Sequence, residues 1–134
     1  MKKDFLTGIK ISMVLYAFIS CGSSCEQKSE VKRTQLQQHD LSIPGREVIQ
    51  SRIDFDAGTE FGKHSHPGEE IIYVLEGVLE YQVEDNSPVT LKKGDVLFIP
   101  AGVVHSAKNT SLIKGSELAT YVVEKGKQLL VMNK

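Results

Sequence analysis

The sequence contains no tryptophan, only two cysteines and no run of like charges. The cysteines are residues 21 and 25, and a bridge between them would close too short a loop to stabilise the chain much. Sixteen basic and seventeen acidic residues give a formal net charge of −1. Without a clustered basic face, this composition excludes a nucleic-acid partner. The mostly apolar run from Ile9 to Ile19 is about half the ~20 residues that a membrane span requires.

The first twenty residues have the composition of a secretory signal peptide. Lys2 and Lys3 form a basic start, the apolar run follows, and small residues lie near Ser20. An amphipathic helix packed on the domain is the alternative, but Lys10 would interrupt its apolar face. We therefore predict a signal peptide over residues 1–20 and export of the protein to the cell envelope.

Cys21 refines the prediction of export. The segment Phe18-Ile19-Ser20-Cys21 resembles the lipobox of bacterial lipoproteins, in which the cysteine becomes the lipidated first residue of the mature chain. Phe18 departs from that pattern, which usually has leucine or another aliphatic residue there. The resemblance implies a membrane contact through this anchor only, in the periplasm or at the outer membrane, and Cys25 receives no role.

The remaining chain divides into a polar segment and a β-rich domain. Residues 21–42 are rich in Gly, Ser, Glu, Gln and Lys, which predicts a flexible tether with His39 as a solvated histidine. The domain is predicted over residues 43–134. From residue 43, short alternating apolar runs are separated by Gly, Pro and Asn, and residues 43–124 show no sustained helical periodicity. Many short strands with regular turns predict an all-β sandwich or barrel in one domain. Residues 126–134 are either a last edge strand or a short tail.

Three histidines and one carboxylate are the candidate metal ligands. His64 and His66 are two residues apart, so on a strand both imidazoles lie on one face. Glu70 follows after Pro67 and a glycine, and His105 lies on a later strand. Such a donor set suits one divalent transition metal: Fe, Mn, Co, Ni, Cu or Zn. An isolated His-x-His pair on a strand usually does not bind metal. The spacing of the surrounding residues therefore decides whether this pair belongs to a metal site.

That spacing contains two ordered motifs. In the first, five residues separate Gly58 from His64-Ser65-His66, three more precede Glu70, and six more precede Gly77. In the second, five residues separate Gly94 from Pro100-Ala101-Gly102, two precede His105, and three precede Asn109. Sixteen residues lie between the motifs. With both motifs complete, the chain resembles the cupin family over about residues 45–124.

The resemblance implies a cupin double-stranded β-helix, also called a jelly-roll barrel, with a metal near its centre. Carried over by position, the ligands would be His64, His66, Glu70 and His105. Glu69 is a competing carboxylate that the strand phase disfavours only weakly. Glu70 could instead act as a catalytic base. The chain is also similar to small single-domain cupins that are often named by analogy with quercetin dioxygenase.

The alternation of the strands predicts which other side chains face the barrel interior. Ile72 and Val74 share the face of Glu70, and Ala107 and Asn109 share that of His105. Three further candidates for the cavity are Arg52, Tyr81 and Phe98. On the opposite face, Ile71, Tyr73 and Leu75 form an apolar surface, covered either by a second copy in a homodimer or by a strand within residues 48–55.

Two functions fit these features. The first is a small metalloenzyme of the dioxygenase, lyase or isomerase type that acts on a small organic molecule. The alternative is a non-catalytic module of the cell envelope that binds a small molecule or a metal, and a purely structural metal is a weaker possibility. The sequence shows no second acid–base pair beside the four predicted ligands.

Overall fold

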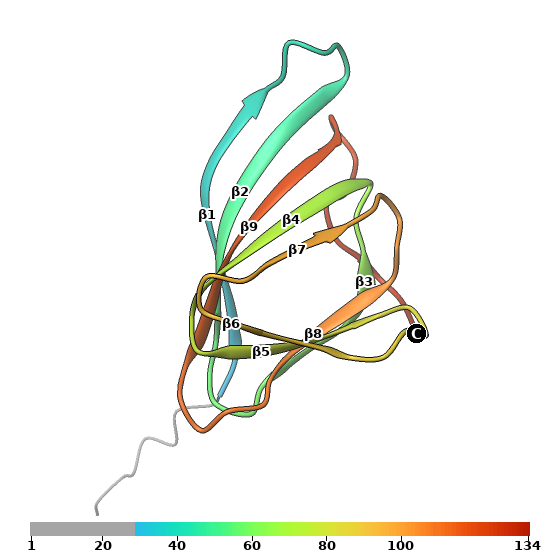
Figure 1. Cartoon of the computed structure of the whole chain (residues 1–134). Coiled ribbons are helices and arrows are strands. Elements are labelled where there is room, and N and C mark those ends of the chain that lie inside the picture. Colours follow the sequence, from blue (N-terminus) through green and yellow to red (C-terminus); the bar gives the residue numbers. More distant parts are fainter. Residues whose placement is uncertain (1–28) are drawn as a thin grey trace, which may run out of the picture.

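A computed structural model describes residues 29–134, in which ten strands form two five-stranded antiparallel sheets. The strand order is β1-β2-β9-β4-β7 in the first sheet and β10-β3-β8-β5-β6 in the second (Figure 1). No helix in this part of the chain is long and apolar enough to cross a membrane. The strands are β1 (Val31–Asp40), β2 (Arg46–Phe55), β3 (Glu60–Ser65), β4 (Gly68–Glu76), β5 (Val78–Val83), β6 (Val89–Lys92), β7 (Val96–Ile99), β8 (His105–Asn109), β9 (Gly115–Glu124) and β10 (Val131–Met132).

The alternation of side chains explains the two-sheet arrangement. In β2, buried and half-buried residues alternate along the whole strand, and β9 follows the same period from Glu117 to Val123. In β4, Ile72 and Val74 are fully buried, as predicted, while Ile71 faces solvent. Both sheets contribute inward-facing apolar side chains to one core, which confirms the all-β prediction.

The N-terminal strand corrects one part of the sequence analysis. The predicted tether at 21–42 is wrong over Val31–Asp40, because β1 pairs with β2 from Val31 opposite Phe55 to Asp40 opposite Glu47. The strand lies at the sheet edge and is mostly exposed, so it needs few apolar residues and resembles a linker in composition. The signal peptide, Cys21 and the first part of the tether lie outside the described residues.

Glycine allows the strands of the first sheet to approach closely at the start of β4. A Cβ atom on Gly68 would lie 2.1 Å from the Val122 carbonyl oxygen and 2.6 Å from the Val123 Cα. Both atoms belong to the backbone of β9, which pairs with β4 at this point. Gly68 therefore permits a strand contact that any side chain would prevent.

Candidate metal centre

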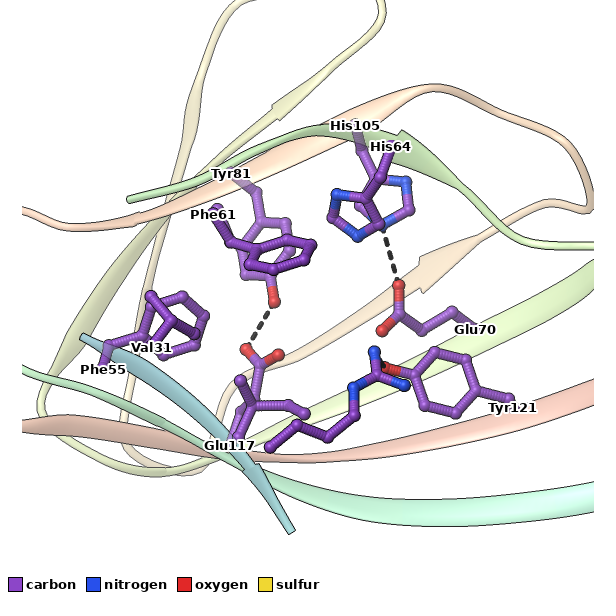
Figure 2. A pocket seen from close by; sticks show the side chains of 12 residues that line it. Val31, Phe55, Phe61, His64, Glu70, Tyr81, His105, Glu117 and Tyr121 are labelled. Carbon is purple, nitrogen blue, oxygen red and sulfur yellow. Dashed lines mark hydrogen bonds and ion pairs between the residues drawn. The ribbon is translucent and has the colours of Figure 1, made fainter. Parts of the chain in front are cut away.

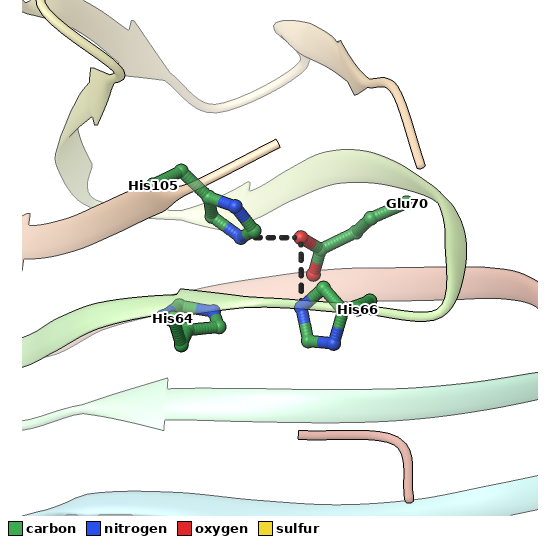
Figure 3. A group of neighbouring side chains, drawn as sticks. All are labelled: His64, His66, Glu70 and His105. Carbon is green, nitrogen blue, oxygen red and sulfur yellow. Dashed lines mark ion pairs between the residues drawn. The ribbon is translucent and has the colours of Figure 1, made fainter. Parts of the chain in front are cut away.

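The fold brings the four predicted ligands together. His64 lies in β3 directly opposite His105, the first residue of β8. His66 follows the end of β3, and Glu70 extends from β4 of the other sheet. One ligand atom from each residue lies within 4.8 Å of those of the other three, and all four residues are at most 5% exposed (Figure 3). Glu70, and not the half-buried Glu69, completes this cluster.

Backbone carbonyls fix the orientation of all three imidazole rings. Nδ1 of His64 and Nδ1 of His105 each lie beside the carbonyl two residues earlier in the chain, at 2.7 and 3.0 Å. Nδ1 of His66 lies 2.7 Å from the carbonyl of Leu129. Because a carbonyl only accepts hydrogen bonds, each Nδ1 carries the proton and each Nε2 presents a lone pair. This is the arrangement by which proteins orient histidines around a metal ion.

The atoms that converge have no hydrogen-bond partners of their own. Nε2 of His105 lies 2.9 Å from Oε2 of Glu70, and Nε2 of His66 lies 3.4 Å from the same oxygen. All three atoms are buried, and none has a hydrogen-bond partner within residues 29–134. Lone pairs that face each other in a buried site repel unless a cation lies between them. The chemistry of this donor set therefore fits a divalent transition metal.

The charge state of the cluster also suits a cation. Burial alone would raise the pKa of Glu70, but the neighbouring imidazoles of His105 and His66 lower it below its ordinary value. Burial lowers the pKa of His64 to about 4. Near neutral pH the site thus contains a carboxylate beside an imidazole that is neutral, and both are the protonation states that bind metal.

A cavity of about 40 Å³ lies beside three of the four cluster residues (Figure 2). Strands of both sheets form its walls, and β1 closes one side. Five of the lining side chains are apolar and seven are polar or charged, a mixture that could both enclose and orient a small polar ligand. The lining residues are Val31, Arg33, Ile53, Phe55, Phe61, His64, Glu70, Tyr81, His105, Ala107, Glu117 and Tyr121.

Two polar pairs in this cavity were not found from the sequence. The Tyr81 hydroxyl donates a hydrogen bond to Glu117, and both residues are at most 3% exposed. Nη2 of Arg33 donates a hydrogen bond of 2.9 Å to the Tyr121 hydroxyl. Glu117 shares the inward face of β9 with Tyr121, so its period-two position was the available signal. Arg33 carries no such signal, because the polar composition around it predicts a tether.

The other cavity candidates have mixed outcomes. Tyr81 lines the cavity, as predicted. Phe98 does not, because it lies on the outer face of β7 and is 58% exposed. Arg52 is also outside, where it pairs with Asp54 at 2.9 Å and with Glu76 at 3.2 Å. Both are at even positions on strands whose odd positions face inward, so the strand phase could have excluded them.

Two antiparallel sheets around a buried cluster of three histidines and one glutamate define a jelly-roll barrel that could hold a metal ion. A family model described as the cupin domain matches residues 51–123. The chain therefore belongs to the cupin family, and its fold is the predicted cupin jelly roll.

Several relatives share this domain. The chain is 36% identical over 89 residues to a germin-like protein (subfamily 2 member 1) of Arabidopsis thaliana, covering 60% of this chain and 41% of that protein. It is 38% identical over 52 residues to the dimethylsulfoniopropionate lyase DddQ of Ruegeria pomeroyi, covering 39% and 26%. The match thus spans less than half the length of these relatives.

Among solved structures, a cupin-like protein from Thermotoga maritima has a TM-score of 0.59 and 27% identity, covering 70% of this chain and 69% of that one.

Proposed function

We propose that this cupin is a metal-dependent enzyme that acts on a small organic molecule. His64, His66, Glu70 and His105 would hold one divalent transition metal: Fe, Mn, Co, Ni, Cu or Zn. The observation that carries the proposal is the convergence of three buried, unpartnered acceptor atoms on one point beside a cavity. When bound, such a metal acts as a Lewis acid toward a ligand oxygen, or supports oxygen chemistry if it is iron.

The chain's own residues would position and enclose the ligand. The imidazoles are held by backbone carbonyls, so they need little reorganisation when a ligand enters. Phe55, Phe61 and Ala107 provide apolar wall that excludes water and strengthens polar interactions inside. Glu70 keeps its ligand role in this proposal, with action as a base as the alternative.

The size of the cavity supports a small ligand. A volume of about 40 Å³ holds roughly three water-sized positions. This favours a molecule of a few heavy atoms over a polycyclic substrate such as quercetin. The Ruegeria relative is named as a lyase, so lyase chemistry is one proposal for the reaction, beside dioxygenase and isomerase chemistry.

Elemental analysis tests the metal site first. Protein purified without a histidine tag is expected to carry about one equivalent of transition metal, by itself or after reconstitution with each candidate ion. His64→Ala and His105→Ala each remove one Nε2 donor and should lose the metal, whereas His39→Ala, on the exposed β1, should keep it. A parent protein that binds no candidate ion would overturn the proposal.

A non-catalytic binding module is the second candidate. Its support is the depth of the cluster, since all four residues are at most 5% exposed and the adjoining cavity is small. Ligands of such a module would raise its melting temperature, but no compound of a substrate panel would be converted to product. An enzyme would form product, and His64→Ala would abolish that activity without loss of fold.

We also propose that the protein is exported and anchored through a lipid on Cys21, on the support of the N-terminal sequence. In bacteria grown with labelled palmitate, the full-length protein should become labelled. Cys21→Ser should abolish the label, and Cys25→Ser, a matched control four residues away, should retain it. Label in the Cys21→Ser variant would contradict the assignment of the anchor.

A homodimer is our proposal for the apolar outer face of the first sheet. Ile71 pairs with Phe98, and Tyr73 pairs with Val96, across neighbouring strands β4 and β7. These four side chains are 44–65% exposed and form one continuous patch. Such a patch at a sheet edge needs cover in solution, and a second copy of the chain provides it symmetrically.

A further inference from the structure

We propose that Glu117 and Tyr81 form a proton-donating subsite across the cavity from the His/Glu cluster. This subsite would bind one oxygen of a small carboxylate whose other oxygen binds the metal. The inference rests on the proposed metal-dependent function, because it assigns the second contact of a ligand held at that site.

The geometry sets this pair apart from ordinary surface carboxylates. Glu117 is 3% exposed and Tyr81 is 2% exposed, and the Tyr81 hydroxyl donates to Oε2 of Glu117 (Figure 2). Within residues 29–134, no basic side chain lies within the 4.0 Å of an ion pair with Glu117. A buried carboxyl group without a cation is stable as the neutral acid. A neutral acid has one O–H to donate.

The surroundings of Glu117 keep it in this form. Burial raises its pKa to about 8, against the lowering effect of the hydrogen bond from Tyr81. Glu70 on β4 contributes to this rise, and Arg33 on β1 opposes it. Apolar residues of β2, Ile53 and Phe55, form the adjoining wall. The titratable and charged groups that line the cavity with Glu117 are Arg33, His64, Glu70, Tyr81, His105 and Tyr121.

The cavity connects this donor to the cluster. Both Glu117 and Glu70 line the same volume of about 40 Å³, which holds a ligand about as large as acetate. A carboxylate has two oxygens, so one can face a metal and the other the Glu117 proton. The guanidinium of Arg33, bound by one hydrogen bond to Tyr121 and without an ion-pair partner in the described chain, adds positive potential that favours an anion.

Acetate binding to the cobalt-loaded protein tests the subsite. Cobalt(II) absorption reports acetate at the metal, and the affinity is measured between about pH 6 and pH 9. Above the pKa of Glu117, this residue is a carboxylate and must take up a proton when acetate binds beside it. The affinity for acetate should therefore fall about tenfold for each pH unit. Glu117→Gln keeps a hydrogen-bond donor that does not titrate. In this variant the fall in acetate affinity should disappear, apart from any fall caused by deprotonation of the metal-bound water.

Tyr81→Phe provides an independent test with a signed shift. Because the phenol's hydrogen bond lowers the pKa of Glu117, its removal should move the inflection to higher pH. Glu47→Gln is the matched control, since Glu47 is a buried glutamate, 7% exposed, that does not line the cavity. This variant should retain the wild-type pH profile.

The outcomes separate the inference from the proposed function. A protein that binds no cobalt contradicts the metal site itself, and with it the subsite. A protein that binds cobalt and acetate, but shows the same pH profile in wild type, Glu117→Gln and Tyr81→Phe, overturns the subsite alone. Loss of the fall in Glu117→Gln together with the upward shift in Tyr81→Phe supports it.

Discussion

Replacing Gly68 with alanine would place a methyl group inside the backbone of β9. The new Cβ would lie 2.1 Å from the Val122 carbonyl oxygen and 2.6 Å from the Val123 Cα, so the two strands must separate. Overpacking typically costs 1–3 kcal/mol, and backbone cannot move aside as a flexible side chain can. We therefore expect Gly68→Ala to lower the free energy of unfolding by about 3 kcal/mol, or the melting temperature by roughly 10–20 °C.

Urea unfolding of the metal-free protein measures this effect without a contribution from metal binding. Gly62→Ala is the matched control, because its Cβ would meet only the Met132 Cε at 4.0 Å. That substitution should be neutral or stabilising by about 0.5–1 kcal/mol, because alanine in a strand loses less conformational entropy than glycine. Equal stabilities of the Gly68→Ala and Gly62→Ala variants would refute the close-approach argument.

The same substitution should also weaken metal binding. Gly68 lies midway between His66 and Glu70, so a backbone shift at this residue displaces two of the four ligand side chains. Metal affinity of Gly68→Ala, measured by competition with a chelator, should fall about 10-fold or more, as for other changes to the support of a site. Gly62→Ala should bind metal with nearly the affinity of the parent.

Three further predictions concern other parts of the fold. Asn109→Ala should lower the free energy of unfolding by about 3 kcal/mol, because Nδ2 donates to three backbone carbonyls, while Ser111→Ala should cost about 1 kcal/mol in the same urea titration. The raised pKa of Glu117 means that the folded state holds a proton the unfolded state has lost, so the contribution of Glu117 to stability should decrease as pH rises from about 4.5 to 8. The lowered pKa of His64 acts in the opposite direction between about pH 4 and 6.5. Glu117→Gln should remove the Glu117 contribution and so make the slope of stability against pH more positive than in wild type, by at most about 1.4 kcal/mol per pH unit. A slope equal to that of wild type would contradict a buried neutral acid. Finally, Phe98→Lys should convert a dimer into a monomer in sedimentation at micromolar concentration, whereas Val89→Lys, at an exposed apolar position of the other sheet, should not; a monomeric parent contradicts the dimer.

The candidate metal centre could be predicted from sequence because local rules determine most of it. His64 and His66 share a strand face by the period of two, and the turn glycines fix where the strands end. The contact of His105 with the other ligands could not be predicted from local rules, since His105 pairs with His64 across forty residues of chain. Only the order and spacing of the two cupin motifs predicted that long-range contact.

Other parts of the site could not be predicted, for two physical reasons. The strand β1 is exposed over nearly its whole length and has little apolar content, so its stability comes from backbone pairing with β2, which composition does not report. Glu117 is one acid in the mostly apolar interior of β9, and its burial goes together with the hydrogen bond from Tyr81 of the other sheet. Partners that are distant in sequence decide both cases.

The backbone carbonyls that orient the three imidazoles have a consequence for how this protein can diversify. Carbonyl groups exist at every position, so the hydrogen bonds that orient the rings do not require particular side chains. Arg33, Glu117 and Tyr121, by contrast, all extend from the opposite sheet. Tyr121 also packs against the His66 ring, with the ring centroids 4.7 Å apart. Mutation of Arg33 and Glu117 can therefore alter ligand preference while the histidines keep their geometry, so laboratory selection for new substrates should begin at these two positions on β1 and β9.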